Sequence, residues 1–146
     1  MTDEERRAIE ADCRDLAMRS MILNDSYEWE ALTDLFTEDA VFIRPNAPDQ
    51  PVVGKPAILA QYKVRPRTRV TRHFVANALI DVQGGDKAKG LLYVLLVAGT
   101  AESEAPNFPI KADPGLLVGE FRDDYVLTES GWRIAKRIGT MILQGA

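Results

Sequence analysis

The sequence is poor in the side chains that build metal centres and disulfides. In 146 residues it has one cysteine, Cys13, and one histidine, His73. A single cysteine excludes a disulfide within the chain and fits a reducing compartment. A zinc site needs several nitrogen or sulfur ligands, so we expect no metal.

Long apolar runs and an excess of basic charge are also missing. No apolar run approaches the roughly 20 residues that a membrane-spanning helix needs. The net charge of −4 provides no electrostatic reason to expect a nucleic acid or an anionic membrane as partner. The first five residues, MTDEE, lack the basic and apolar regions of a signal peptide. We therefore expect a cytoplasmic protein with no nucleic-acid or membrane partner.

What the chain does have is enough apolar content for one core. Its composition, 46% hydrophobic and 27% charged, is that of an ordinary globular protein. A chain of this length buries roughly 70% of its unfolded surface. No internal repeat, low-complexity tract or linker divides it. The sequence predicts a single domain over residues 1–146.

The first half of the chain carries helical patterns. Apolar residues recur every three or four positions from Thr2 to Asn24, which predicts an amphipathic helix. Asp25 and Glu28 match a capping box, so we expect Asp25 to be the N-cap of a second helix over 26–36. The next predicted elements are a strand over 40–43, a proline-rich loop over 44–51 and a helix over 54–62.

The second half reads as long strands separated by turns. It is rich in β-branched residues, and glycines mark the turns near 84–86 and 129–131. The predicted strands cover 68–82, 89–99, 116–128 and 132–143. Helices followed by a meander of strands predict an α+β fold, with the helices packed on one face of a curved antiparallel sheet.

Three segments carry a resemblance to a known family. They are 25–42 (DSYEWEALTDLFTEDAVF), 71–77 (TRHFVAN) and the pair DDY at 123–125 with GWRIAKR at 131–137. The order of elements resembles the NTF2-like, cystatin-like superfamily, and the residues resemble its SnoaL-like branch of dehydratase-type proteins. The resemblance implies a curved antiparallel sheet whose N-terminal helices enclose a pocket for a small apolar molecule.

Within that branch the chain is similar to scytalone dehydratase, bile acid 7α-dehydratase and hexachlorocyclohexane dehydrochlorinase. These proteins share an Asp–His pair that maps onto Asp25 and His73, and the last two also share an arginine that maps onto Arg137. The resemblance implies a lyase or isomerase that needs no cofactor and forms a homo-oligomer, with a trimer preferred. Those dehydratases continue past their last strand with a segment that helps cover the pocket, whereas this sequence ends at Ala146.

The chemistry of these three side chains supports the same interpretation. A histidine titrates near neutral pH and can accept a proton from carbon or oxygen. A carboxylate on its other nitrogen fixes the tautomer and stabilises the imidazolium. Arg137 can hold an oxyanion or a departing hydroxide or halide. We therefore expect a hydrogen bond between Asp25 and His73 facing a cavity, and a small apolar alcohol, ketone or ring compound as substrate.

Neighbours of the pair are candidates for substrate binding. Strand alternation places Thr71, Val75, Asn77 and Leu79 on the same face as His73. Tyr27 lies close to Asp25 in the sequence. We take Tyr27, Val75, Asn77 and Leu79 as the predicted substrate-binding residues. The same alternation does not decide which face of the last strand Arg137 presents to the pocket.

Other interpretations remain open at this stage. The protein could be a non-catalytic ligand-binding module, or an assembly subunit resembling the β subunit of ring-hydroxylating dioxygenases. A polyketide cyclase with Asp123 or Asp124 as base is a third reading, which leaves His73 without a role. The basic run over 65–72 is interrupted by proline within an acidic protein, so we expect a solvated loop and strand edge there.

Overall fold

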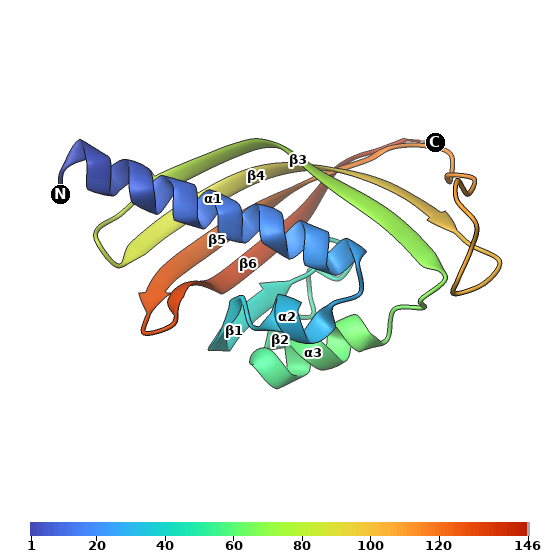
Figure 1. The fold of residues 1–146 in the computed structure, drawn as a ribbon, viewed down its shortest axis with the longest axis horizontal. Coiled ribbons are helices and arrows are strands. Elements are labelled where there is room, and N and C mark those ends of the chain that lie inside the picture. The colour runs from blue at the N-terminus through green and yellow to red at the C-terminus, as the bar shows by residue number, and fades with distance from the viewer. Residues whose placement is uncertain (146) are drawn as a thin grey trace.

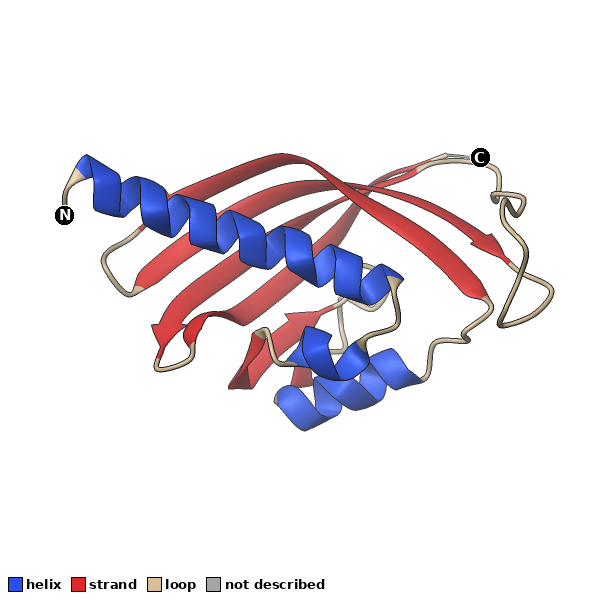
Figure 2. Cartoon of the chain, viewed as in Figure 1, coloured by secondary structure: helices blue, strands red, loops and turns tan. Residues whose placement is uncertain are grey.

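The molecule is built on one six-stranded sheet in the order β2-β1-β6-β5-β4-β3, with three helices on its concave side (Figures 1 and 2). The computed structural model describes residues 1–145. The elements are α1 (Asp3–Asp25), α2 (Trp29–Thr33), β1 (Phe36–Ile43), β2 (Val52–Val53), α3 (Lys55–Lys63), β3 (Arg69–Val82), β4 (Lys87–Thr100), β5 (Leu117–Thr128) and β6 (Gly131–Gln144). The predicted α+β architecture, with N-terminal helices on one face of a curved sheet, is confirmed (Figure 1).

Helix α1 lies across the sheet and packs chiefly on β3 (Figure 1). It begins with a capping box, in which the Thr2 hydroxyl accepts from the Glu5 amide at 3.1 Å and the Glu5 carboxylate accepts from the Thr2 amide at 2.6 Å. Its buried face is the predicted apolar stripe, extended by Met21: Cys13, Leu16, Ala17, Ser20 and Met21. No helix among residues 1–145 combines the length and the apolar character needed to span a membrane.

The junction between the first two helices differs from the prediction. Asp25 is the last residue of α1 and does not cap α2, whose N-cap is Glu28 without a side-chain hydrogen bond. The Ser26 hydroxyl donates to the Ile22 carbonyl at 2.9 Å, which closes the helix end. Tyr27 then turns the chain with a φ of 61°. The second helix is consequently shorter than predicted, and β1 begins at Phe36.

The sheet is mixed, which corrects the antiparallel expectation. Strands β3 to β6 pair antiparallel in sequence order, but β1 runs parallel to β6 at the other side. β1 follows α1 and α2 in the chain and is not joined to β6 by a hairpin, so no tight turn forces these two strands to be antiparallel. The two-residue strand β2 then pairs antiparallel with β1, and α3 covers this edge (Figure 1).

A β-bulge in β3 changes which side chains share a face. The pairing register with β4 shifts between Val75 and Asn77, so Ala76 is an extra residue. Thr71, His73 and Val75 point to the helix side, but beyond the bulge Asn77 is exposed and Leu79 is 69% exposed. The prediction that Asn77 and Leu79 share the face of His73 is therefore wrong, because strict alternation ends at the bulge.

The outer face of the sheet keeps large apolar side chains in contact with solvent. Phe74, Leu79 and Tyr93 are exposed by 53%, 69% and 46%. Apolar surface of this kind is typical of protein–protein contacts. We therefore keep the prediction of a homo-oligomer, with a trimer preferred.

The double variant Phe74→Lys/Leu79→Lys should shift the protein to monomers, because charges cannot be buried unpaired in an apolar interface. Multi-angle light scattering at micromolar concentration measures this. Val53→Lys, at a 62% exposed position on β2, serves as the matched control and should leave the mass unchanged. A monomeric parent protein would contradict the prediction.

Candidate functional site

A cavity of about 450 Å³ opens between the end of α1, the end of β1, α3 and the concave face of the sheet. Its wall includes Met21, Phe42, Tyr62, His73, Phe121 and Arg137. Tyr62 stacks between Trp29 and Phe42, with ring centroids 5.5 and 5.8 Å apart. The three rings form a continuous aromatic row beside the cavity.

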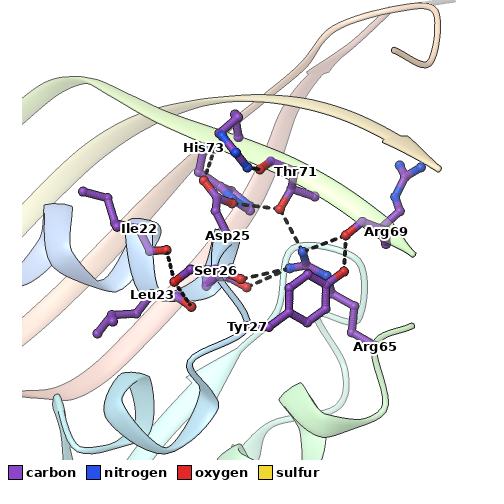
Figure 3. Close-up of polar contacts among 11 residues, drawn as sticks. Ile22, Leu23, Asp25, Ser26, Tyr27, Arg65, Arg69, Thr71 and His73 are labelled. Carbon is purple, nitrogen blue, oxygen red and sulfur yellow. Dashed lines mark hydrogen bonds and ion pairs between the residues drawn. The ribbon is translucent and has the colours of Figure 1, made fainter. Parts of the chain in front are cut away.

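Asp25 and His73 meet at this cavity as predicted (Figure 3). The Asp25 Oδ1 lies 2.6 Å from the His73 Nδ1, and the Asp25 Oδ2 accepts from the His73 backbone amide at 2.9 Å. The two side chains are 10% and 13% exposed. His73 lines the cavity, whereas Asp25 does not line it and contacts the His73 ring at Nδ1. Since Nδ1 is occupied, Nε2 is the nitrogen left for a ligand.

The neighbours of Asp25 define where the protons lie. The Arg65 Nη2 donates to the Thr71 hydroxyl at 2.9 Å, and a guanidinium can only donate. The Thr71 hydroxyl proton therefore points to the Asp25 Oδ1, 2.8 Å away. Burial raises the pKa of Asp25, but the hydrogen bonds from His73 and Thr71 and the charge of His73 outweigh it. The net result is a pKa below the ordinary 3.8, so Asp25 is a carboxylate at neutral pH.

One edge of the Arg137 guanidinium forms a bidentate ion pair with Asp123. Its Nε and Nη2 donate to the two Asp123 carboxylate oxygens at 2.8 and 2.7 Å, and its Nη1 donates to the Ser20 hydroxyl at 2.8 Å. The Tyr125 hydroxyl completes the set by donating to Asp123 at 2.7 Å. Arg137 and Asp123 are 2% and 1% exposed. Arg137, predicted as the anion-binding residue, is therefore buried, and Asp123 balances its charge.

The charges of this second network are stable over the working pH range. Burial lowers the pKa of Arg137, but the charge and hydrogen bonds of Asp123 raise it more, so the guanidinium stays ionised. Burial and the Asp123 carboxylate raise the pKa of Tyr125 well above its ordinary value. Burial also raises the pKa of Tyr62 to about 12. Both tyrosines are hydrogen-bond donors at neutral pH.

The architecture and this site can be compared with known proteins. A family model described as the SnoaL-like domain matches residues 5–138. The chain belongs to the SnoaL-like domain family. None of the curated proteins matches the sequence.

Solved structures share the fold of this SnoaL-like domain along nearly all of its length. A scytalone dehydratase-like protein from Novosphingobium aromaticivorans DSM 12444 has a TM-score of 0.82 at 18% identity, covering 98% of this chain and 90% of that chain. A hexachlorocyclohexane dehydrochlorinase, LinA-type3, from Novosphingobium barchaimii LL02 has a TM-score of 0.79 at 20% identity, covering 99% and 94%. A protein assigned as an aromatic ring hydroxylase, also from Novosphingobium aromaticivorans, has a TM-score of 0.74 at 20% identity, covering 94% and 91%.

The four predicted substrate-binding residues of this SnoaL-like domain are not part of the cavity wall. Tyr27 lies under Arg65, and its hydroxyl donates to the carbonyls of Pro66 and Arg69. Val75 points inward but packs into the core cluster of Met21, Leu92 and Val94. Asn77 and Leu79 lie on the outer face beyond the bulge. Proximity in sequence and strand alternation were therefore insufficient to identify the wall.

Several wall residues were missed by the sequence reasoning. Phe42, Tyr62 and Phe121 come from three elements that meet only in the fold, so no local pattern joins them. Arg69 and Thr71 also line the cavity, and alternation from His73 does mark these two. Neither Asp123 nor Asp124 lines it, so the aspartate-base reading has no aspartate in the cavity to act.

Within residues 1–145 no three His, Cys, Asp or Glu side chains gather as metal ligands would. The chemistry that the described side chains offer is proton transfer and hydrogen bonding. His73 lines the cavity together with several hydrogen-bond donors, among which are Tyr62 and Arg137.

The stability of the SnoaL-like domain should depend on the ionisation of Asp25. Its folded pKa lies below its unfolded value, so the carboxylate stabilises the fold above about pH 4, and this contribution is lost as the pH falls through the folded pKa. Urea unfolding between pH 2 and 7 should show a smaller acid-induced loss for Asp25→Asn than for the parent protein. Asp49→Asn, at an exposed position, should keep the parent profile. Identical profiles for all three proteins would contradict this assignment.

The Arg137–Asp123 pair should behave as a coupled unit. Arg137→Met leaves a buried carboxylate without its counter-charge and should cost about 3–5 kcal/mol in the free energy of unfolding. The double variant Arg137→Met/Asp123→Asn should lose less than the single variant, since it buries no lone charge. Urea unfolding of Arg137→Met, of Asp123→Asn and of the double variant gives the coupling free energy between the two residues. Strictly additive losses would show that the two residues act independently.

Proposed function

We propose that this SnoaL-like domain is a cofactor-independent lyase or isomerase of the dehydratase type. Its substrate is a small, mostly apolar alcohol, ketone or ring compound. The observation that carries the proposal is the 2.6 Å contact of the Asp25 Oδ1 with the His73 Nδ1, on a histidine that lines a 450 Å³ cavity with apolar walls. A purely structural histidine has no need of a carboxylate partner beside an open cavity.

His73 is the general base in this proposal. Asp25 accepts a hydrogen bond from the Nδ1–H of His73, which leaves the Nε2 lone pair free to accept a proton from the substrate. The imidazolium that forms is stabilised by the Asp25 carboxylate 2.6 Å away. Asp25 stays ionised throughout because its pKa is lowered. It acts through His73 and does not itself touch the substrate.

Arg137 and Tyr62 assist the leaving group. Arg137 donates three hydrogen bonds to Asp123 and Ser20, and the second protons of its two Nη atoms remain for a ligand in the cavity. The ion pair with Asp123 makes it a hydrogen-bond donor with little net charge. In a dehydration, His73 takes the proton from carbon, the C–H electron pair forms the C=C double bond, and the C–O bond breaks. The departing hydroxide takes the proton back from the His73 imidazolium and leaves as water.

The alternative is a non-catalytic subunit, for which the likeness to the aromatic ring hydroxylase structure at a TM-score of 0.74 is the specific observation. An assembly subunit needs the fold but not the Asp25–His73 pair. Replacing His73 distinguishes the two functions. An enzyme should lose its activity, whereas an assembly subunit, in which His73 is only structural, should still bind its partner subunit.

The catalytic proposal predicts the behaviour of two variants on any small alcohol or halide that the protein turns over. His73→Ala should lower kcat/KM about 10²–10⁴-fold while the fold is retained. Asp25→Asn should lower it on the order of 10³–10⁴-fold, because an amide that donates to Nδ1 imposes the wrong tautomer and cannot neutralise the imidazolium. Circular dichroism verifies folding, and initial rates measure turnover.

The neutral His73 ring is the active form in this proposal, so the rate of the parent protein should fall as the solution is made acidic. A folded Asp25→Asn variant with full activity would reduce Asp25 to a tie between α1 and β3. A folded His73→Ala variant with full activity would remove the proposed base altogether.

A further inference from the structure

The cavity wall is strongly biased in charge. Four arginines and His73 line it, and no aspartate or glutamate among the described residues does. The four arginines are Arg44, Arg65, Arg69 and Arg137. This bias is unexpected in a chain of net charge −4. It also revises the expectation for the basic run 65–72, because two of its arginines face the cavity.

Two of these arginines have their charge balanced inside the protein. Arg137 pairs with Asp123 at 2.7 Å, and Arg69 pairs with Asp113 at 2.6 Å. Arg44 and Arg65 take part in none of the ion pairs among residues 1–145. They are two cations at one cavity without a counter-charge.

Several contacts hold the Arg65 guanidinium in place (Figure 3). Its guanidinium lies 4.5 Å over the Tyr27 ring and 5.5 Å from the Trp29 ring. Its Nη atoms donate to neutral oxygens, the Asn24 Oδ1 at 2.9 Å and the Thr71 hydroxyl at 2.9 Å. Its Nε is buried and has no hydrogen-bond partner within the described chain. The positive charge is therefore fixed in place and only partly solvated.

Arg44 is the freer of the two. It follows directly after β1 and lines the cavity beside Pro45 and Asn46. Its Nε is buried without a partner within residues 1–145. Arg44 also lines a second, neighbouring pocket with Gln61 and Val64, and these two residues lie at the end of α3, shortly before Arg65 in the chain. Both cations thus belong to the same end of the cavity.

A buried N–H without an acceptor costs free energy, and an unbalanced cation attracts an anion more strongly in a partly desolvated site than in water. The apolar part of the wall is formed by residues from α1 and from four strands: Met21, Phe42, Leu96, Leu117, Phe121 and Met141. We propose that the cavity binds molecules with an apolar body and an anionic head group, and that Arg44, supported by the fixed charge of Arg65, binds the head group. This deepens the proposed function by naming the substrate class, and it rests on the same cavity.

Calorimetric titration with three matched probes tests this inference. The probes are biphenyl-4-carboxylate, biphenyl-4-phosphonate and the neutral biphenyl-4-carboxamide. The better of the two anions should bind the parent protein at least about tenfold more tightly than the amide, as a charge-assisted pair requires. The comparison of the two anions identifies which head group the arginines prefer. The preference over the amide should decline as salt is raised.

Arg44→Gln should remove most of the preference for the anion and leave the affinity for the amide nearly unchanged. Arg44→Lys, which keeps the charge, should retain part of the preference and also covers the case in which the glutamine variant does not fold. Arg6→Gln is the matched control, because Arg6 is exposed in the first turns of α1 and outside the cavity. It should bind all three probes as the parent does.

Equal binding of acid and amide by the parent protein, no binding of either acid, or a preference that survives in folded Arg44→Gln would each overturn the inference. Binding needs no turnover, so the two proposals fail separately. A protein that prefers the anion but has no His73-dependent activity would refute the proposed function alone. A protein with that activity but no preference would refute the anionic head group alone.

Discussion

The carboxylate of Asp25 is the interaction on which the site depends. It ends α1 and accepts hydrogen bonds from the backbone and ring of His73 and from Thr71, both on β3. A carboxylate at the C-terminus of a helix is disfavoured by the helix dipole. The three donors offset that cost, so the helix end is held to the strand. The same bonds orient the His73 ring toward the cavity.

The hydrogen bonds around Asp25 and His73 continue to Arg65, which also lines the cavity. Arg65 donates to Thr71, Thr71 donates to Asp25, and Asp25 contacts His73, so one chain of hydrogen bonds joins the Arg65 guanidinium to the His73 ring. Arg65 is in turn supported from below by the Tyr27 ring, at the residue whose positive φ turns the chain after α1. The helix junction thus positions both the His73 ring and the Arg65 charge.

Arg137 shows how the same residue type serves a different purpose. Its pairing with Asp123 and Ser20 connects β5, β6 and α1 beneath the cavity floor. The pair balances one positive charge internally, while Arg44 and Arg65 are left unbalanced. Charge in this cavity is therefore distributed unevenly. The charge of Arg137 in the interior is balanced by Asp123, whereas the charges of Arg44 and Arg65, toward α3, are not balanced by an ion pair among the described residues.

Much of the fold and the central pair were predictable from the sequence, because local patterns and family motifs carry them. The stripe of α1, the long strands and the Asp25–His73 contact all agree with expectation. The role of Asp25 as a helix cap was wrong, since its spacing to Glu28 matches a motif that the chain does not use. A spacing shows which bonds are possible, and the competing partners on β3 lay 46 and 48 residues away.

The sequence by itself determined the fold class, the amphipathic helix and the pairing of Asp25 with His73. Only the tertiary structure decided the cavity wall and the partner of Arg137. A bulge at Ala76 moved Asn77 and Leu79 to the outer face, and a register shift in β5–β6 between Asp124 and Tyr125 placed Asp123 opposite Arg137. Bulges break the two-residue alternation on which strand predictions depend, and they are set by contacts between strands that no local pattern records.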